Sequence, residues 1–376
     1  MQLKIDNNTQ LNMKFVKTII LSLTLMTIHS SLSLSLNNNQ HIPVFLAADD
    51  NYAPFVATTM ASILKNTKSH IDFYVLSDGI TAKNKVKIAN ERKWFKNFSL
   101  RFIDIDKKLE KLSGRNSLSR ATFGRFFIPE LVPSIKKVLY LDVDMIVKKD
   151  IKKLYDVDLD KYAFAAVAEA LRIQKNCNDR LNKYFSAGIP SNHRYFNAGM
   201  LLINAEKWRE ERIKDKLMEI ALKYSGDKNF LYLDQDALNI NFANNYKEVN
   251  KIMNNELHIL NIYLDEEKNN GITEAKLIDD TIVLHYSGGG EKPWLNNRVK
   301  YANEFWKIVP YTDFADEIKQ IHDNSQRDMK IMQHIDRNAA KINKYVRRKV
   351  KLVYILLGVL IGLNIAGLVV LVRRRK

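Results

Sequence analysis

The sequence contains almost no cysteine and shows no internal repeat. Cys177 is the only cysteine, so no disulfide can form within the chain and no metal site can be built from cysteine thiolates. We expect this single thiol to be unreactive. Acidic residues are absent from 341–376, where ten lysines and arginines carry most of the formal net charge of +17. The basicity of the chain is therefore largely a property of its C-terminal end.

The basic C-terminal end does not indicate nucleic-acid binding, because no platform of basic and aromatic residues stands out elsewhere. Its charges flank an uncharged apolar segment, 352–372. At about 1.5 Å per residue, such a helix would match a bilayer core of about 30 Å. We therefore expect a single-pass membrane protein, with orientation left open because basic residues lie on both sides. Gly358 and Gly362 would favour a helix dimer, so a homodimer is one option.

Changes of composition divide the chain into five parts. Within residues 1–40, the segment from Met13 has a basic start, a short apolar stretch and a run of small residues, as in a secretion signal; an uncleaved anchor and an overlong gene start are the alternatives. Residues 41–310 have a globular composition. Residues 311–351 are polar, with apolar residues in 3-4 spacing, and predict a basic helical stalk. The predicted membrane helix, 352–372, and a basic tail, 373–376, complete the chain.

Residues 41–310 alternate between predicted strands and predicted helices. This alternation indicates an α/β fold with a mostly parallel sheet, in which ligands bind outside the carboxyl ends of the strands. Residues 171–190 are expected to be loop. The predicted strands are 42–48, 71–76, 100–105, 137–147, 164–168, 195–204 and 282–286, and the predicted helices are 53–65, 81–95, 119–131, 208–224 and one starting near 232.

The most informative stretch is 137–147, an apolar strand that carries Asp142 and Asp144. The chain has five Asp-x-Asp triplets, but only this one lies within an apolar run. Side chains two apart on a strand point to the same side, so two carboxylates would be crowded and would need a cation. His285, at the end of a later strand, is a candidate third ligand. An imidazole ligand favours Mn²⁺ over Mg²⁺, although Mg²⁺ stays an alternative.

Three further polar clusters suit a nucleotide diphosphate linked to a sugar. The segment Gly288–Gly290 would let backbone approach a phosphate, and Lys292 would place a charge beside it. The segment Asp49–Tyr52 could contact a base and ribose, and Asp234–Asp236 could contact sugar hydroxyls. Each cluster alone also fits ordinary turn or helix-capping chemistry. Their combination with the carboxylate pair favours a metal-dependent nucleotide-sugar site.

Together these motifs resemble glycosyltransferase family 8, which includes glycogenin and lipopolysaccharide glucosyl- and galactosyltransferases. The resemblance implies a GT-A (Rossmann-like) fold, a retaining hexosyltransferase, Mn²⁺ and a UDP-sugar donor, usually UDP-glucose or UDP-galactose. The acceptor would be a glycan, glycolipid or glycoprotein. The resemblance covers about residues 42–310 and rests on five motifs in order: Ala47-Ala48-Asp49-Asp50-Asn51-Tyr52, Leu139-Tyr140-Leu141-Asp142-Val143-Asp144, Phe196-Asn197-Ala198-Gly199, Asp234-Gln235-Asp236, and His285 through Trp294.

The resemblance also implies roles for individual residues. Asp142, Asp144 and His285 would hold the metal, and Lys292 the diphosphate. Six residues separate His285 from Lys292 where the family usually has five, so either Gly288 or Gly289 would face the phosphates. The other implied contacts are Asp49, Asn51 and Tyr52 with uridine, Arg125 with the donor, Asn197 and Ala198 with the sugar, and Asp234 and Gln235 as the catalytic candidates.

Two other functions are weighed against this one. An apolar strand ending in Asp-x-Asp also begins phosphatases of the haloacid dehalogenase type, but Ile146 occupies their Thr or Val position and three predicted strands precede the motif. A membrane-tethered sugar-nucleotide or carbohydrate-binding protein without turnover is the second alternative, and the intact Asp142, His285 and Lys292 oppose it. The sugar, the acceptor, and the choice between front-face attack and double displacement stay open.

Overall fold

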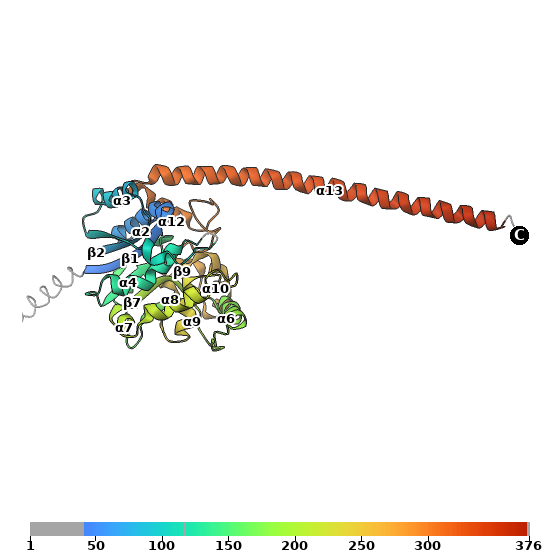
Figure 1. The fold of residues 1–376 in the computed structure, drawn as a ribbon. Helices are drawn as coiled ribbons and strands as arrows, with labels where there is room; N and C mark the ends of the chain where they lie inside the picture. The colour runs from blue at the N-terminus through green and yellow to red at the C-terminus, as the bar shows by residue number, and fades with distance from the viewer. Residues whose placement is uncertain (1–40, 116–117, 374–376) are drawn as a thin grey trace, which may run out of the picture. The chain divides into compact units, whose positions relative to one another are not determined.

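The computed structural model describes residues 41–115 and 118–373, which form two compact units (Figure 1). Among the described residues, the first unit contains the chain from His41 to Pro293 together with Arg298–Ile318. The second contains Trp294–Asn297 and the chain from Lys319 onward. The predicted leader, 1–40, lies outside the described residues.

A seven-stranded sheet forms the centre of the first unit, with strand order β3-β2-β1-β4-β7-β6-β8. The pairs β1–β2, β2–β3, β1–β4 and β6–β8 are parallel, whereas β7 is antiparallel to both β4 and β6. A three-stranded sheet has the order β5-β10-β9. The predicted α/β class is therefore confirmed. The strands are β1 His41–Asp49, β2 His70–Asp78, β3 Phe98–Asp104, β4 Lys137–Leu141, β5 Met145–Val147, β6 Phe164–Ala168, β7 Phe196–Asn204, β8 Lys247–Glu248, β9 Asn255–Glu256 and β10 Val283–His285.

Most helices are short and pack around the large sheet (Figure 1). The α-helices are α2 Ala53–Asn66, α3 Ala82–Ala89, α4 Ile128–Leu131, α5 Lys152–Tyr155, α6 Leu171–Phe185, α7 Ala205–Glu210, α8 Ile213–Lys223, α9 Asp234–Phe242, α10 Leu260–Glu266, α11 Glu274–Asp280, α12 Ala302–Trp306 and α13 Ala315–Arg373. The 3₁₀-helices are η1 Asp50–Tyr52, η2 Asn90–Lys93, η3 Asp106–Leu109, η4 Arg120–Phe127, η5 Lys251–Met253, η6 Leu257–Ile259, η7 Lys268–Asn270 and η8 Val309–Tyr311.

Helix α2 holds the turn that carries the two aspartates. It is buried from Ala53 to Leu64, as expected for a helix against the sheet. The Thr59 hydroxyl lies 3.0 Å from the carbonyl oxygens of both Val143 and Met145. A buried hydroxyl group that forms hydrogen bonds to the backbone at two positions of a turn limits the movement of that turn.

The single strand predicted over 137–147 is wrong, because the chain leaves the large sheet at Leu141 and enters the small one at Met145. Asp142 and Asp144 lie in the turn between β4 and β5. The N–H of Asp142 donates to the carbonyl of Gly199 (2.8 Å) on β7, and the carbonyl of Asp144 accepts from the N–H of Tyr286 (3.0 Å) after β10. The sequence is apolar on both sides of the two aspartates because β4 and β5 are both buried.

Two other predicted elements also differ from the structure. Residues 171–190 were expected to be loop, but they contain α6. Its buried positions follow helical spacing and include Gln174 and Asn178, whose polarity hides the apolar periodicity. The helix predicted over 208–224 is two helices, α7 and α8, separated at Arg212, where φ is +52°.

The core beside β6 and β7 is strongly aromatic. The Phe164 ring is fully buried, and its centroid lies 5.1 Å from that of Phe196, 4.7 Å from that of Phe242 and 6.0 Å from that of Trp208. Tilted and edge-on contacts of this kind stabilise a core beyond the area that they bury. This cluster supports the start of strand β7, which carries Asn197 and Ala198 at the candidate site.

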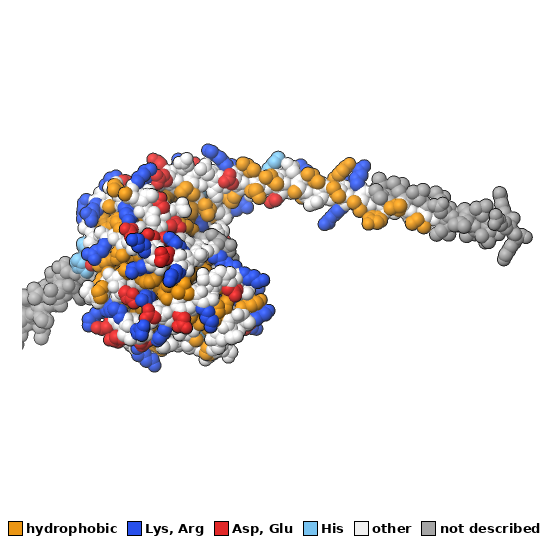
Figure 2. All heavy atoms as spheres, in the orientation of Figure 1, with side chains coloured by type: hydrophobic (Ala, Val, Ile, Leu, Met, Phe, Trp, Pro, Cys, Tyr) orange, Lys and Arg blue, Asp and Glu red, His pale blue; other side chains and the backbone are white. Residues whose placement is uncertain are grey.

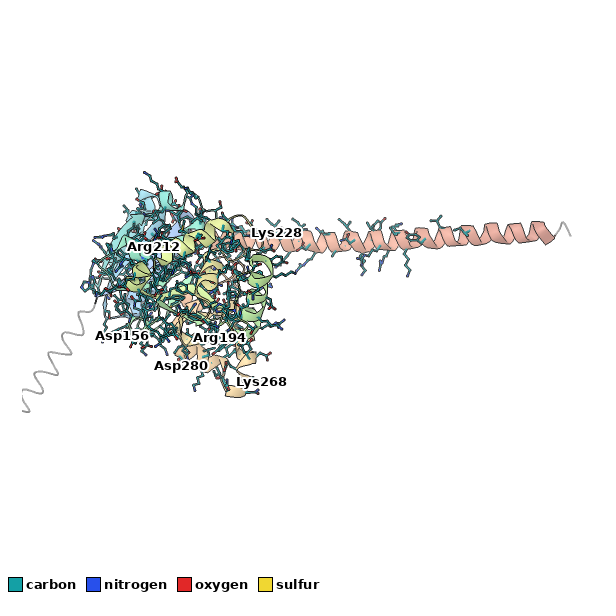
Figure 3. The ribbon with its side chains drawn as sticks, turned by 60° about the horizontal axis from the view of Figure 1, so that its bottom comes forward. Asp156, Arg194, Arg212, Lys228, Lys268 and Asp280 are labelled. Carbon is teal, nitrogen blue, oxygen red and sulfur yellow. The ribbon has the colours of Figure 1, made fainter. Side chains whose placement is uncertain are left out.

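Charged side chains of both signs are interspersed on the visible face of the first unit (Figure 2). Arg194 and Arg212, both labelled in Figure 3, each form an ion pair: Arg194 pairs with Glu248 at 2.7 Å, and Arg212 pairs with Asp215 at 2.9 Å. Such exposed pairs contribute at most about 1 kcal/mol each. The surface charges therefore bear on solubility more than on the fold.

The second unit is built mainly from α13. Its N-terminal part is rich in charged and polar residues, and within this unit the Ser325 hydroxyl donates to the carbonyl of Leu295 (2.8 Å). Among the residues that the structure describes, no helix is both long enough and apolar enough to cross a membrane. Segment 352–372 is instead the end of this 59-residue helix. The predicted single-pass membrane location is therefore corrected.

Glu91 provides a stability prediction. Its side chain is buried, neither carboxyl oxygen has a hydrogen-bond partner among the described residues, and burial together with Asp313 raises its pKa to about 9. The carboxyl group is therefore protonated in the folded state but ionised in the unfolded state at neutral pH. The unfolded state therefore loses the proton of Glu91 at a lower pH than the folded state, and the free energy of unfolding falls as pH rises from about 4.5 to about 9. At pH 7 the protein is less stable by about 3 kcal/mol than at pH values below about 4.5, as far as this group is concerned.

We therefore expect Glu91→Gln to stabilise the protein at pH 7–8 and to have little effect near pH 4.5. Urea unfolding at both pH values measures this difference. The exposed Glu110→Gln is the matched control. An equal change of unfolding free energy at the two pH values would contradict the assignment of a buried neutral carboxyl group to Glu91.

Candidate active site

A cavity of about 420 Å³ lies at the carboxyl ends of β1 and β4 in the first unit. This volume is within the range of about 300–1,000 Å³ typical of small-molecule sites. Asn51 is exposed and outside the cavity wall, whereas Ala198 and Asp234 are buried behind it. The other predicted site residues all line it: Asp49, Tyr52, Arg125, Asp142, Asp144, Asn197, Gln235, His285, Gly288, Gly289 and Lys292.

Asp142, Asp144 and His285 line this cavity and converge on one another. Strand β10 is antiparallel to β5 and places His285 opposite Met145, next to the aspartate turn. The Nε2 atom of His285 lies 3.1 Å from Asp144 Oδ1 and 4.0 Å from Asp142 Oδ2. One ligand atom from each side chain lies within 4.8 Å of the other two. The two carboxylates thus converge through a turn between two sheets, and not through the strand alternation that the sequence suggested.

The carboxylate of Asp144 is neutralised from two sides. The Lys292 ammonium group donates to its Oδ2 atom, and His285 faces its Oδ1 atom. Burial alone would raise the pKa of Asp144, but Lys292 and His285 hold it well below its ordinary value. Asp144 is therefore ionised at any physiological pH, as a metal ligand must be.

A chain of hydrogen bonds determines which nitrogen of His285 faces the carboxylates. Asn197 donates its amide N–H to Glu256 (2.8 Å), so its oxygen is the acceptor that receives the N–H of Gly199 (2.8 Å). The same oxygen accepts the amide N–H of Asn254 (2.9 Å). The oxygen of Asn254 must then accept from His285 Nδ1, 3.1 Å away. Nε2 of His285 is therefore the nitrogen that faces the two aspartates, and it would offer its lone pair to an ion that replaces its proton.

This arrangement fits a divalent cation. Two carboxylates and an imidazole lone pair meet at one point, and each group is a known ligand of Mn²⁺-like ions. Burial lowers the pKa of His285, but the carboxylate of Asp144 outweighs this effect and raises it. The raised pKa reports a strongly negative environment, which a bound cation would also relieve.

Arg125 joins the metal-binding carboxylates to the predicted catalytic pair. Its guanidinium is buried, lies 2.8 Å from Asp142 Oδ1 and 2.9 Å from Asp234 Oδ2, and stacks 4.3 Å from the Tyr140 ring centroid. Burial raises the pKa of Asp234 to about 6, against the effects of Arg125 and of the Thr122 hydroxyl, 2.5 Å away. The resemblance implied that Arg125 contacts the donor, but most of its hydrogen-bonding groups are taken by the protein.

The three residues of the Asp234–Asp236 motif have different surroundings. Gln235 lines the cavity, and its side-chain oxygen accepts from the Ala198 N–H (2.9 Å). Asp236 is fully buried and pairs with Arg180 at 2.7 Å, so it stabilises the fold. Leu233, just before the motif, has φ +45° and ψ −109°, a strained backbone for a residue with a side chain. This strain lies at the start of α9, directly beside the site.

The cavity includes residues that the sequence reasoning missed, among them Glu169, Cys177, Glu256 and His258. Glu169 follows β6, whose carboxyl end lies at the same sheet edge as that of β4, so its position was a usable signal. Burial and the neighbouring Glu256 raise the pKa of Glu169 well above its ordinary value. No motif indicated Glu256 or His258. Burial raises the pKa of the Cys177 thiol to about 12, which agrees with an unreactive cysteine.

The glycine segment after β10 also reaches the cavity. Gly288 adopts φ +84°, a conformation that favours glycine, and a Cβ atom there would lie 3.5 Å from the His258 ring. His258 Nδ1 lies 2.7 Å from the Ser287 hydroxyl. Gly288 and Gly289 both line the cavity, so either can present backbone to a ligand.

Comparison with known proteins identifies the family of the chain. The model of the family described as glycosyl transferase family 8 matches residues 43–298. General stress protein A of Bacillus subtilis (strain 168) is 30% identical over 276 residues, which are 70% of this chain and 92% of that protein. The lipopolysaccharide 1,2-glucosyltransferase of Escherichia coli (strain K12) is 27% identical over 305 residues, covering 79% and 83% of the two chains.

A solved structure of the galactosyltransferase LgtC in complex with donor and acceptor sugar analogs is also similar. It superposes with a TM-score of 0.60 at 27% identity and covers 72% of this chain and 96% of its own. This likeness supports the GT-A-like arrangement of the mixed sheet. With a family match over most of the chain, the protein belongs to glycosyl transferase family 8.

Proposed function

We propose that this glycosyltransferase is a metal-dependent, retaining hexosyltransferase that moves glucose or galactose from a UDP-sugar to a hydroxyl group of a glycan, glycolipid or glycoprotein. The observation that carries the proposal is the convergence of Asp142, Asp144 and His285, with Lys292 beside them, on one cavity at the carboxyl ends of two parallel strands. The names of the glucosyltransferase and galactosyltransferase relatives support the choice of sugar.

The uridine part of the donor would bind at the end of β1. Asp49 and Tyr52 line the cavity there, and Asp49 Oδ1 accepts from the Tyr52 N–H at 3.3 Å. Burial and the surrounding aspartates raise the pKa of Tyr52 to about 12, so the hydroxyl stays protonated and can donate. Asn51 is exposed outside the cavity wall, so we assign it no donor contact in this conformation.

The departing diphosphate would be stabilised where the metal-ligating side chains and Lys292 meet. Asp142, Asp144 and His285 would hold a divalent ion, for which Mn²⁺ suits the nitrogen ligand better than Mg²⁺. That ion supplies Lewis-acid stabilisation of the charge that develops on the phosphate oxygens. Lys292 contributes a second positive charge, and the backbone at Gly288 or Gly289 approaches the phosphates.

Transfer with retention is best explained by front-face attack. Both carboxyl oxygens of Asp234 face protein groups, Arg125 and Thr122, and the residue does not line the cavity. Asp234 is thus poorly placed as a nucleophile, and Gln235 would position the sugar. The acceptor oxygen forms a bond to the anomeric carbon while the bond between the anomeric carbon and the phosphate oxygen breaks. The proton of the acceptor hydroxyl passes to the departing phosphate.

The proposal is tested by release of the nucleoside diphosphate (UDP, or GDP from the last donor) from UDP-glucose, UDP-galactose, UDP-N-acetylglucosamine and GDP-mannose, each with Mn²⁺, Mg²⁺ or EDTA. We expect turnover of a UDP-hexose with Mn²⁺ and none with EDTA. Release of phosphate from simple monoesters would favour the phosphatase alternative. Binding of a UDP-sugar with no turnover, with or without added glycan acceptors, would favour the binding-protein alternative.

Gly199 provides a prediction specific to the histidine ligand. A Cβ atom at this position would lie 2.5 Å from His285 Cε1 and 2.8 Å from the end of the Met145 side chain. Gly199→Ala should therefore displace the imidazole and lower the apparent affinity for Mn²⁺ by about 10- to 100-fold, the usual effect of disturbing the groups that orient a metal ligand. Mn²⁺ titration of UDP release measures the effect. Gly358→Ala, where nothing lies within 4 Å, is the matched control; an equal effect of both would refute this role of Gly199.

A further inference from the structure

A second cluster of metal-ligating side chains lies at the amino ends of β1 and β2, and the carboxyl end of β1 lines the donor cavity. Strands β1 and β2 are parallel, and their register pairs His41 with His70. Asp72 is two residues beyond His70 and therefore points to the same face of the sheet. Two imidazoles and a carboxylate are thus brought to one face by strand pairing.

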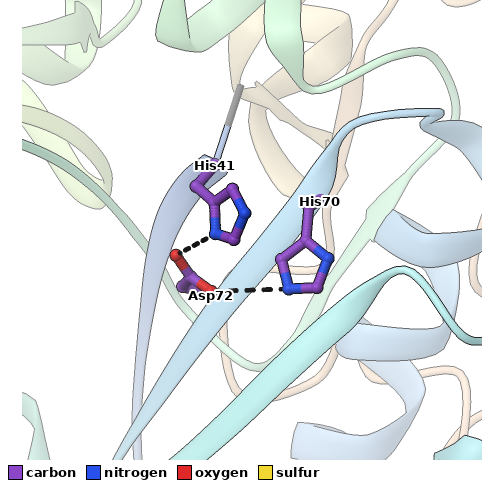
Figure 4. A group of neighbouring side chains, drawn as sticks. All are labelled: His41, His70 and Asp72. Carbon is purple, nitrogen blue, oxygen red and sulfur yellow. Dashed lines mark hydrogen bonds and ion pairs between the residues drawn. The ribbon is translucent and has the colours of Figure 1, made fainter. Parts of the chain in front are cut away.

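The three side chains converge as Figure 4 shows. His41 Nδ1 lies 2.9 Å from one oxygen of Asp72, and His70 Nε2 lies 3.6 Å from the other. One ligand atom from each residue lies within 4.8 Å of the other two. The two imidazole rings stack with centroids 4.3 Å apart. The Ser99 hydroxyl, on β3, donates to Asp72 at 2.6 Å and orients the carboxylate.

The cluster is open to solvent and separate from the donor site. The side chain of His41 is 59% exposed, so an ion can reach the cluster and the ring has room to rotate toward it. Strand β1 runs from His41 to Asp49, eight steps, and at about 3.3 Å per step this places the cluster about 26 Å from the donor end. None of the three residues lines the donor cavity.

We propose that His41, His70 and Asp72 form a second binding site, for a divalent transition metal of the class that prefers imidazole, with Zn²⁺ as its representative. Two nitrogen ligands select against Mg²⁺ and Ca²⁺, which take oxygen ligands. Three protein ligands leave a fourth tetrahedral position for water. Because the ligands come from two neighbouring strands, the ion would link β1 to β2 and stabilise the folded state.

The test uses the full-length, untagged chain carrying Asp142→Asn and Asp144→Asn, which removes the other metal cluster and makes the result independent of transfer activity. Zn²⁺ is titrated by calorimetry, and Co²⁺ is added as a spectroscopic probe of the ligand field. We expect one equivalent of Zn²⁺ and a rise of the melting temperature. Adding His41→Gln and His70→Gln should weaken Zn²⁺ binding by at least about tenfold. Adding His334→Gln instead, which removes an exposed histidine outside the cluster, should change nothing.

Two outcomes would overturn the proposal. One is the absence of Zn²⁺ binding in the chain that retains His41, His70 and Asp72. The other is unchanged Zn²⁺ affinity after both histidines are replaced, which would place the ion elsewhere. The melting temperature of the histidine variant without metal shows whether this variant is folded, and it should match that of the parent chain.

Discussion

Replacing both Asp142 and Asp144 with asparagine should reduce Mn²⁺-dependent UDP release on the order of 10³-fold or more. Lewis-acid stabilisation of a leaving group is worth several kcal/mol, and each 1.36 kcal/mol is about tenfold in rate. Asparagine keeps the shape of each side chain but removes both negative ligands. The residual rate should no longer respond to Mn²⁺, which a titration of the metal at saturating donor measures.

The control for this double variant is Asp156→Asn with Asp158→Asn. These residues form another Asp-x-Asp pair of the same chain, but both are exposed, and Figure 3 shows Asp156 at the periphery. The control removes the same charge and should leave the rate and its metal response unchanged. A normal rate in the Asp142 and Asp144 variant, with its melting temperature preserved, would show that these carboxylates do not hold the functional metal.

Replacing Arg125 with leucine should destabilise the protein by about 3–5 kcal/mol, the usual cost of leaving a buried charge unpaired. The guanidinium contacts both Asp142 and Asp234 and is buried, so no solvent replaces it. Denaturant unfolding measures the loss. Arg194→Leu is the control: it also loses a pair to a carboxylate, that of Glu248, but the two side chains are 41% and 42% exposed. Its loss should be within about 1 kcal/mol.

A second substitution separates charge from packing in the Arg125 result. Adding Asp234→Asn to Arg125→Leu removes one of the two unpaired charges and should recover part of the lost stability, because the two sites are in direct contact. If the two changes are simply additive, the cost of Arg125→Leu comes from packing and the electrostatic explanation is wrong.

The sequence predicts the first half of the sheet well because local signals and tertiary context agree there. The run 42–48 is apolar and β-branched, and the next helix has a continuous apolar face with Pro54 in its first turn. The position of Asp49 at a strand end follows from these two elements. Thr81 caps α3 as its sequence suggests, since its hydroxyl accepts the N–H of Asn84 at 3.3 Å.

The donor site could be predicted in its components but not in its geometry. Periodicity within 137–147 does not reveal that the chain changes sheets between Asp142 and Asp144, because both halves are buried and apolar. The approach of His285 depends on pairing between β5 and β10, which are far apart in the sequence. Glu256 and His258 escaped notice because they belong to no motif and their place at the site comes from tertiary contacts alone.

The turn between β4 and β5 gives the proposed ion a mechanical role. One aspartate is tied by its backbone to the large sheet through Gly199, and the other to the small sheet through Tyr286. An ion held by both carboxylates would bridge the two sheets, so its binding energy would also oppose their separation. Amide hydrogen exchange in β9 and β10 should therefore slow when Mn²⁺ and UDP are added. The pocket that holds the donor would then become more rigid as it fills.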